Sequence, residues 1–456
     1  MSKVKVGFLP LYVKLYDDVC PQYRPHVEAF MNDAAARLEA EGVELVKAPV
    51  CRLKDEFMAA TELFNKNDVD AVVTLHLAYS PSLESIDALL KIKAPLIVMD
   101  STPTYDFTDH AQVMTNHGIH GVQDMCNLLR QNGRGYFIEA GHISESDVVA
   151  RVAGLCRAAK AAKTLRSCRV GAIGEPFAGM GDFRITPERL KEYFGATIVD
   201  FDFSKIKDYV VTDAEIDAEI AKDKENFVIE CEIDEDYRES TRANLIVKKW
   251  MDAEKLDAFT FNFLACTKAS GMPRVPFMAA CKEMAEGRGY AGEGDVMTAA
   301  FVGALLSAFP GTTFAEMFCP NWKEGTIFLS HMGEWNIAHA MEKPSVLKMD
   351  YNYTDCGDPV ISYGTYKAGP AIFWNVAPQQ DGYDFIIAPI EMLDQKSETM
   401  HDQVEGWFKP ALPLEQFLPA YSLAGGTHHG GFVYGATMAE MEAFGKLCGM
   451  KVVKIA

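Results

Sequence analysis

The first hundred residues alternate short apolar runs with longer amphipathic ones, and no other feature of the sequence constrains the fold as strongly. The apolar runs expected to be strands are residues 4–9, 43–48, 71–75 and 95–99. The stretches expected to be helices are residues 21–41, 53–65 and 81–91. Apolar strands separated by helices pair in parallel and bury both faces. This pattern predicts a doubly wound parallel sheet, whose ligands bind beyond the carboxyl ends of the strands, near Tyr12.

A second alternating unit follows, with strands expected at residues 169–173, 197–202 and 258–263. A glycine-rich loop at residues 177–184, which includes Phe183, comes after the first of these strands. Beyond about residue 325, segments rich in glycine and threonine have strand-like composition. The predicted fold class is therefore α/β, with two doubly wound parallel-sheet α/β domains followed by a mostly antiparallel β domain. The expected domain boundaries are 1–167, 168–325 and 326–456.

The chain is acidic, with 64 Asp and Glu against 44 Lys and Arg and a net charge of -20. Because phosphate groups require clustered basic residues, neither nucleic acid nor an anionic membrane is an expected partner. No apolar run has the length that spans a bilayer, and the first residues lead directly into a strand, so no signal peptide is expected. The eleven cysteines are scattered without a Cys-x-x-Cys pair, which is typical of reduced thiols. A cytoplasmic protein is expected.

Two acids and a histidine, Glu293, Glu316 and His331, lie in an otherwise glycine-rich and apolar stretch. A lone acid in such surroundings is costly unless it is paired or binds a metal. Hard divalent ions such as Mn²⁺ accept mixed carboxylate and imidazole ligands. Glu293 also precedes a helix expected at 296–307, so a role as helix cap is the alternative for this residue.

Two strands of a hairpin are expected at residues 312–319 and 326–331. If two residues form the loop, Glu316 lies directly opposite His331, with Cβ atoms roughly 5 Å apart. A three-residue loop with Gly325 in the left-handed conformation shifts the register by one residue and separates the two side chains. The sequence does not decide between these two registers. Pro320 requires an edge position or a bulge.

Two pairs of histidines lie among glycines. His117 and His120 open a helix, and His428 and His429 stand between two glycine pairs. Such histidines can approach a ligand closely. The alternatives are a surface loop with capping histidines for the first pair and a flexible loop for the second.

Five sequence elements are spread along most of the chain. In order, they are Met180-Gly181-Asp182 with Arg184, Gly289-Tyr290-Ala291-Gly292-Glu293-Gly294-Asp295, Glu316 in its strand, Ser330-His331-Met332 with Glu334, and Gly425-Gly426-Thr427-His428-His429. Each element is weak alone, and together they are specific. In this order they resemble the L-arabinose isomerases, within the wider L-arabinose/L-fucose isomerase group.

The resemblance implies two α/β domains followed by a β-rich domain. The protein ligands of a Mn²⁺ ion, which Co²⁺ could replace, would be Glu293, Glu316, His331 and His429. His428 would lie beside the substrate, and His120 matches a family histidine that reaches into the site of a neighbouring subunit. A homo-oligomer, hexamer or tetramer, with sites at subunit interfaces is therefore expected.

Two positions depart from the family pattern. Leu9-Pro10 stands where the family has a sugar-contacting Gln, and His117 replaces a second family Gln. The four implied metal ligands are unaffected. The expected substrate is a sugar, a pentose or 6-deoxyhexose that is L-arabinose- or L-fucose-like, bound near His428, His120, His117, Tyr12 and Phe183.

The expected activity is aldose–ketose isomerisation through an enediolate, with Glu293 and Glu316 taking up and returning protons. Which of the two is the base is left open, and no nucleotide or redox cofactor is implied. Two alternatives remain. A non-catalytic sugar-binding protein would need no metal, and a metal-dependent sugar epimerase or lyase on the same scaffold would differ in its product.

Overall fold

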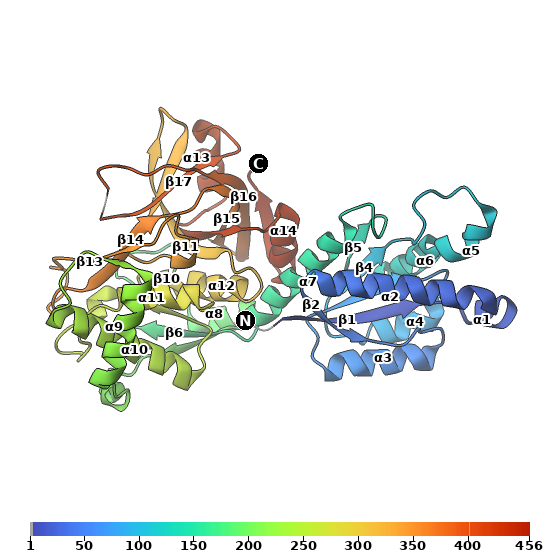
Figure 1. Ribbon diagram of the computed structural model, residues 1–456, viewed down its shortest axis with the longest axis horizontal. Coiled ribbons are helices and arrows are strands. Elements are labelled where there is room, and N and C mark those ends of the chain that lie inside the picture. Colours follow the sequence, from blue (N-terminus) through green and yellow to red (C-terminus); the bar gives the residue numbers. More distant parts are fainter. Residues whose placement is uncertain (1–2, 401) are drawn as a thin grey trace. The chain divides into compact units, whose positions relative to one another are not determined.

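The computed structural model describes residues 3–400 and 402–456 (Figure 1). The chain divides into two compact units, unit 1 (residues 1–160) and unit 2 (residues 161–456), and helix α7 (Val148–Leu165) contains the boundary. Among the described residues, no helix combines the length and the apolar character needed to cross a membrane. The boundaries of the three domains expected from the sequence remain a prediction.

In the described part of unit 1, five parallel strands form one sheet in the order β2-β1-β3-β4-β5. The strands are β1 (Val4–Leu11), β2 (Val43–Lys47), β3 (Ala71–His76), β4 (Leu96–Asp100) and β5 (Tyr136–Ala140). The helices before α7 are α1 (Lys14–Val19), α2 (Arg24–Ala40), α3 (Lys54–Lys66), α4 (Ser82–Leu89), α5 (Val113–Asn116) and α6 (Gly118–Gln131). Strand residues Leu9, Val72 and Val98 share a core with Phe57 and Phe64 of α3. The predicted parallel sheet is confirmed.

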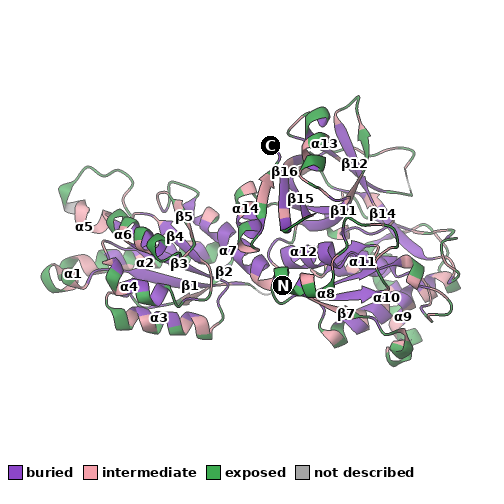
Figure 2. Ribbon diagram, turned by 180° about the vertical axis from the view of Figure 1, so that it is seen from behind, coloured by how far each residue is buried: buried purple, intermediate pink, exposed green. Residues whose placement is uncertain are grey.

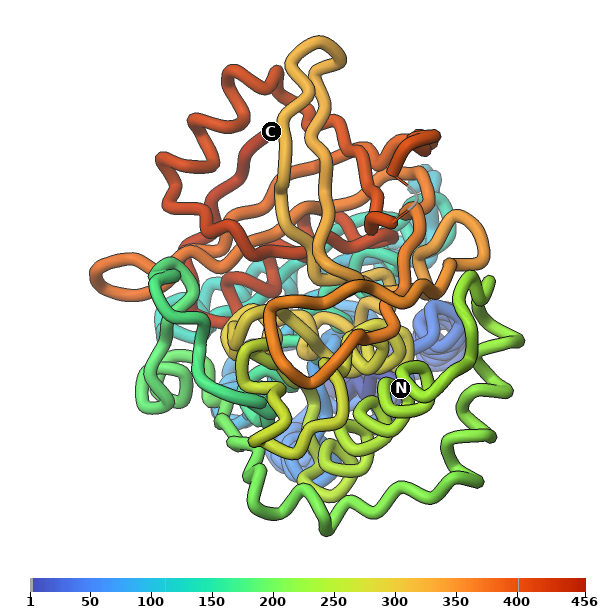
Figure 3. Tube along the Cα trace, turned by 90° about the vertical axis from the view of Figure 1, so that its left-hand side faces the viewer, coloured from blue at the N-terminus to red at the C-terminus, as the bar shows by residue number. Residues whose placement is uncertain are grey.

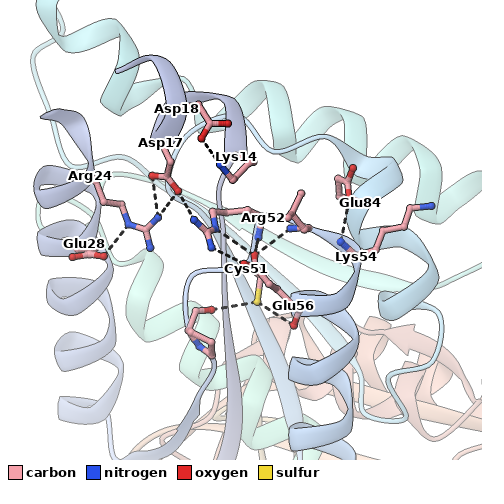
Figure 4. A network of polar contacts seen from close by, with 12 residues as sticks. Lys14, Asp17, Asp18, Arg24, Glu28, Cys51, Arg52, Lys54, Glu56 and Glu84 are labelled. Atoms are coloured by element: carbon pink, nitrogen blue, oxygen red, sulfur yellow. Dashed lines mark hydrogen bonds and ion pairs between the residues drawn. The ribbon is translucent and has the colours of Figure 1, made fainter. Parts of the chain in front are cut away.

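Asp17 connects the segment after β1 to the rest of unit 1 (Figure 4). Its carboxylate accepts hydrogen bonds from Arg24 of α2 at 2.9 Å and from Arg52, just before α3, at 2.6 Å. Arg52 also pairs with Glu56 at 2.6 Å. These ion pairs fix the segment that begins at Tyr12, beyond the carboxyl end of β1.

Unit 2 contains a second parallel sheet, in the order β10-β9-β6-β7. Its strands are β6 (Arg169–Ile173), β7 (Thr197–Asp200), β9 (Ala258–Phe261) and β10 (Gly289–Gly292). The helices of this part are α8 (Pro187–Phe194), α9 (Asp213–Asn226), α10 (Glu235–Glu254), α11 (Phe277–Ala285) and α12 (Val296–Leu306). This sheet confirms the second α/β pattern predicted from the sequence.

The remainder of the described unit 2 forms a ten-stranded, mostly antiparallel sheet, as predicted, in the order β19-β16-β15-β18-β11-β12-β17-β14-β13-β8. Its strands are β8 (Val228–Ile229), β11 (Thr312–Asn321), β12 (Thr326–Ser330), β13 (Ser345–Lys348), β14 (Val360–Thr365), β15 (Gly369–Gln379), β16 (Gly382–Met392), β17 (Val404–Pro410), β18 (His429–Tyr434) and β19 (Lys451–Lys454). Two helices accompany them, α13 (Leu414–Leu423) and α14 (Met438–Leu447). Because β16 pairs with β17 as well as with β15, the strands from β16 through β15, β18, β11 and β12 to β17 close into a barrel.

Helix α12 is shared by the two sheets of unit 2. It is buried along its whole length (Figure 2). It contacts β6, β9 and β10 of the parallel sheet and β11, β15 and β18 of the barrel. Phe301, near its centre, lies with its ring centroid 5.0 Å from that of Phe194 and 6.4 Å from that of Phe385. A helix that is apolar on every side is stable only where it is buried on every side, which explains its composition.

Strands β11 and β12 form the predicted hairpin (Figure 3), but the direct pairing of Glu316 with His331 is wrong. Near the turn, the strands keep the register expected for that pairing. A β-bulge at Phe318 then shifts the register by one residue, so Glu316 lies opposite Ser330. Pro320 lies in the outer part of β11, beyond the residues that pair with β18, so it occupies the edge position that proline requires.

Candidate metal centre

The side chains predicted to bind a metal come together within unit 2, although they are far apart in the sequence. His331 Nε2 lies 3.7 Å from Glu316 Oε2, and His429 Nε2 lies 3.6 Å from Glu293 Oε2. Glu316, His331 and His429 offer ligand atoms that all lie within 4.8 Å of one another, and so do Glu293, His428 and His429. These five residues are called the ligand cluster below.

The strand order β18-β11-β12 explains why Glu316 lies between two histidines. On one side Glu316 is opposite His429, and on the other it is opposite Ser330, the residue before His331. Phe314 precedes Glu316 by two residues and so lies on the same face of β11. Its ring contacts the rings of both histidines edge-on, with centroid distances of 5.1 Å. The barrel therefore places three members of the ligand cluster.

Glu293 lies in the turn between β10 and α12, with a φ of 60°. This left-handed conformation is unusual for a residue with a side chain and is found mostly where the surroundings enforce it. The cap of α12 is Asp295, whose Oδ1 accepts a hydrogen bond from the Thr298 amide at 2.9 Å. The alternative role of Glu293 as helix cap is therefore wrong. Its peptide oxygen accepts a hydrogen bond from the Phe177 amide at 2.9 Å, which helps to fix the turn.

Two histidines of the cluster are each held by a buried carboxylate. His429 Nδ1 hydrogen-bonds to Asp295 Oδ2 at 3.0 Å. His331 Nδ1 contacts Glu334, which also accepts a hydrogen bond from the hydroxyl of Tyr290. A carboxylate at Nδ1 fixes the orientation of an imidazole and leaves Nε2 available to bind a metal ion. The buried Nε2 of His429 has no hydrogen-bond partner within the described part of the chain, as expected for an atom reserved for a ligand.

The loop after β6 holds the third histidine. The amide of His428 donates a hydrogen bond to Asp182 Oδ2 at 2.9 Å, and its Nδ1 hydrogen-bonds to the same oxygen at 2.7 Å. The other nitrogen of His428, Nε2, lies 3.9 Å from Glu293 Oε2. Phe183 stacks on His429, with ring centroids 4.9 Å apart and an interplanar angle of 13°. Asp182 and Phe183 thus bring the glycine-rich loop after β6 into contact with the cluster.

Burial and neighbouring charges shift the pKa values of the cluster in different directions. Burial raises the pKa of Glu316, although the three histidines oppose this. Burial also acts to raise the pKa of Glu293, but the nearby imidazoles of His428, His331 and His429 bring that pKa below its usual value. Burial would lower the pKa of His331, yet the carboxylate of Glu334 raises it to about 9. Protons and a metal ion would compete for the same atoms, so metal binding must depend on pH.

The donor set fits a divalent metal ion. It offers two carboxylates and three imidazoles, and Asp295 and Glu334 add further negative charge directly behind two of the imidazoles. Oxygen and imidazole ligands suit ions such as Mn²⁺ and Co²⁺. The identity of the ion stays a prediction.

Tyr12, His117 and His120, also predicted to bind substrate, lie in unit 1 and form a group of their own. Nε2 of His117 hydrogen-bonds to the hydroxyl of Tyr16 at 2.8 Å, and its ring centroid lies 5.8 Å from that of His120. Tyr16 in turn lies against Tyr12, with ring centroids 5.9 Å apart. His117 stands at the N-cap of α6 without a side-chain capping bond, so it does not cap that helix; its Nδ1 instead hydrogen-bonds to the Val113 carbonyl of α5 at 2.8 Å. The roles of the group stay predictions.

The sequence did not assign roles to four residues that support the cluster, namely Asp182, Asp295, Glu334 and Tyr290. All four belong to the motifs quoted above, and each carboxylate holds a histidine of the cluster. For Asp295 and Glu334, the available signal was an acidic residue two or three positions from a predicted metal ligand. That spacing alone does not reveal which histidine the acid contacts, because the contacts of Asp182 and Asp295 join distant segments.

Comparison with known proteins gives matches over most of the chain. The family model of the L-arabinose isomerase central domain matches residues 190–308, and that of the L-arabinose isomerase C-terminal domain matches residues 311–451. Together these matches cover more than half of the chain, and they include every member of the ligand cluster.

Several curated proteins are similar over nearly the whole length. The L-arabinose isomerase of Lactiplantibacillus plantarum is 25% identical over 444 residues, which cover 92% of this chain and 92% of the relative. The L-arabinose isomerase of Salmonella enteritidis is 24% identical over 461 residues, which cover 95% of this chain and 90% of the relative. The L-arabinose isomerase of Geobacillus kaustophilus is 24% identical over 401 residues, which cover 84% of this chain and 80% of the relative.

Gly292 provides a test of the cluster geometry. A Cβ at this position would lie 2.8 Å from Cε1 and 3.0 Å from Nε2 of His331. We expect Gly292→Ala to displace the imidazole and to weaken Mn²⁺ binding by about tenfold or more, measured by calorimetry on metal-stripped protein. The control is Gly181→Ala in the nearby glycine-rich loop, where no described atom lies within 4 Å of the added carbon. Equal Mn²⁺ affinity of the two variants would contradict the assignment of His331 to the metal.

Proposed function

The chain belongs to the L-arabinose isomerase family as a divergent member, and on this premise we propose that it is a metal-dependent aldose–ketose isomerase acting on a pentose or 6-deoxyhexose. Enzymes of this family are aldose–ketose isomerases, that is, intramolecular oxidoreductases. The observation that carries the proposal is the meeting of Glu293, Glu316, His331 and His429 in one partly buried cluster. L-Arabinose and sugars related to it, including L-fucose-like ones, are the proposed substrates.

The residues proposed to hold the ion are Glu293, Glu316, His331 and His429. A divalent ion supplies Lewis acidity for the carbonyl and hydroxyl oxygens of an open-chain sugar. His331 and His429 present Nε2, because Glu334 and Asp295 occupy their Nδ1 atoms. The barrel strands and the turn after β10 provide a rigid frame, so the ligand atoms need little rearrangement on binding.

Glu293 and Glu316 are the proposed proton carriers. Conversion of an aldose to a ketose moves one hydrogen from C2 to C1 and one proton from O2 to O1, through an enediolate, with no change in composition. One carboxylate would take the proton from C2, and the same or the second carboxylate would return a proton to C1. His428 lies within 3.9 Å of Glu293 and is held by Asp182, so it is placed to bind a sugar hydroxyl beside the carboxylates.

The proposal is tested by product formation in the presence and absence of a metal. Metal-stripped protein should be inactive, and Mn²⁺ or Co²⁺ should restore ketose formation from L-arabinose or another pentose or 6-deoxyhexose. The measurement is a screen of these sugars with identification of the product by chromatography. Full turnover under excess chelator would refute the metal dependence.

The same screen separates the alternatives. A non-catalytic sugar-binding protein would bind sugar without a metal and form no product, whereas an epimerase or lyase would give an aldose epimer or a cleaved product.

Glu316→Gln tests the proton carrier directly. The substitution keeps the size of the side chain but removes its basic carboxylate, so turnover should fall by at least about a hundredfold. The control is Glu324→Gln, at an exposed position in the turn of the same hairpin, which should leave turnover unchanged. Near-normal turnover of Glu316→Gln at saturating Mn²⁺ would remove Glu316 from the chemistry.

We further propose a homo-oligomer, hexamer or tetramer, in which His120 of one subunit completes the site of a neighbour. His120→Asn and His429→Asn proteins should then each be nearly inactive. Subunits of the two variants, denatured and refolded together, should regain activity, because some sites receive an intact His120 and an intact His429 from different chains. Absence of any regain, with mixed oligomers confirmed by mass spectrometry, would place His120 outside a shared site.

A further inference from the structure

Tyr290 is a buried phenol that stands directly behind the ligand cluster. It lies on β10, and its side chain is fully buried against aromatic rings, with centroids 4.9 Å from Phe259, 5.3 Å from Phe261 and 6.1 Å from Phe314. In these surroundings its hydroxyl donates a hydrogen bond to one oxygen of Glu334. The other oxygen of Glu334 contacts Nδ1 of His331. A chain of contacts therefore runs from Tyr290 through Glu334 to a proposed metal ligand.

The second histidine of the cluster is supported in a parallel way. One oxygen of Asp295 holds His429 Nδ1 at 3.0 Å, and its other oxygen accepts the Thr298 amide in the first turn of α12 at 2.9 Å. For both His331 and His429, one oxygen of a carboxylate contacts Nδ1 of the imidazole. The other oxygen of the same carboxylate accepts a hydrogen bond from a separate donor. For Asp295 that donor is the helix N-terminus, where peptide N–H groups favour a carboxylate. For Glu334 the corresponding donor is the hydroxyl of Tyr290.

We propose that Tyr290 is a positioning residue that anchors Glu334, so that His331 presents Nε2 to the metal. This inference rests on the proposed metal dependence. Glu334 is only 3% exposed, and a carboxylate at such a site needs a partner for each oxygen. If the hydroxyl is lost, the carboxylate can rotate and the imidazole it holds loses its fixed orientation. The phenol remains a donor because burial and the charge of Glu334 raise the pKa of Tyr290 well above its usual value.

The test is the Mn²⁺ affinity of Tyr290→Phe, measured by titration calorimetry of the metal-stripped full-length protein. Removal of a partner of a metal-binding histidine typically weakens metal binding by about 10–100-fold, and we expect a loss of this size. Because Tyr290 acts through His331 and touches no substrate, saturating Mn²⁺ should restore most of the turnover.

A matched control is Tyr237→Phe. Tyr237, on α10 of the same unit, is also buried, and its hydroxyl donates to the carboxylate of Asp223 at 3.3 Å, away from the cluster. Both variants remove a buried phenol–carboxylate hydrogen bond, so both should lower the melting temperature. Only Tyr290→Phe should weaken Mn²⁺ binding. If the two variants bind Mn²⁺ as tightly as the natural protein, the inference is overturned.

A second variant covers the case in which Tyr290→Phe does not fold. Glu334→Asp keeps the negative charge but is one methylene shorter, so it cannot bridge Tyr290 and His331 at once. It should weaken Mn²⁺ binding on the same scale, and unchanged affinity would overturn the bridge. If the natural protein itself binds neither Mn²⁺ nor Co²⁺, the proposed function fails, and this result is distinct from a failure of the role of Tyr290.

Discussion

The burial of α12 is the constraint on which unit 2 depends. The helix has no polar side to offer to water, so it forms only because the parallel sheet and the barrel enclose it together. Its first turn is fixed by Asp295, and the same carboxylate holds His429 in the ligand cluster. The packing of the core and the geometry of the site therefore share a residue. A change in how the helix packs would move His429 and disturb the cluster.

The cluster carries an electrostatic cost that a cation would relieve. Four carboxylates, those of Glu293, Glu316, Asp295 and Glu334, surround the histidines in a region of low exposure. Like charges in such a region repel one another, and buried ions are stabilised only by close partners. A divalent ion would supply that partner and would stabilise the folded chain by binding to it alone. Chemistry and stability would then depend on the same ion.

Sequence reasoning predicted the two parallel sheets and the mostly antiparallel β domain, because the pattern of apolar and polar residues is a local signal, whereas the set of residues in the cluster was implied by the family resemblance. It did not reach the bulge at Phe318, since one extra residue in a strand leaves the composition of the hairpin unchanged. It considered Glu293 as the helix cap and did not identify Asp295, because both acids stand close to the first turn. It also did not connect Asp182 to His428, because that contact joins segments far apart in the chain.

The bulge at Phe318 separates the hairpin into two parts that differ in how well they tolerate changes of length or sequence. On the inner side, Glu316 is fixed between β12 and β18, so any insertion there would turn its side chain to the other face of the sheet. On the outer side, β11 pairs with β12 alone, and Phe318 and Trp322 are exposed. Changes of length or sequence at the tip can be absorbed at the bulge without reaching the cluster. Over evolutionary time the tip of this hairpin is therefore free to diverge into a new surface while the residues of the ligand cluster stay in place.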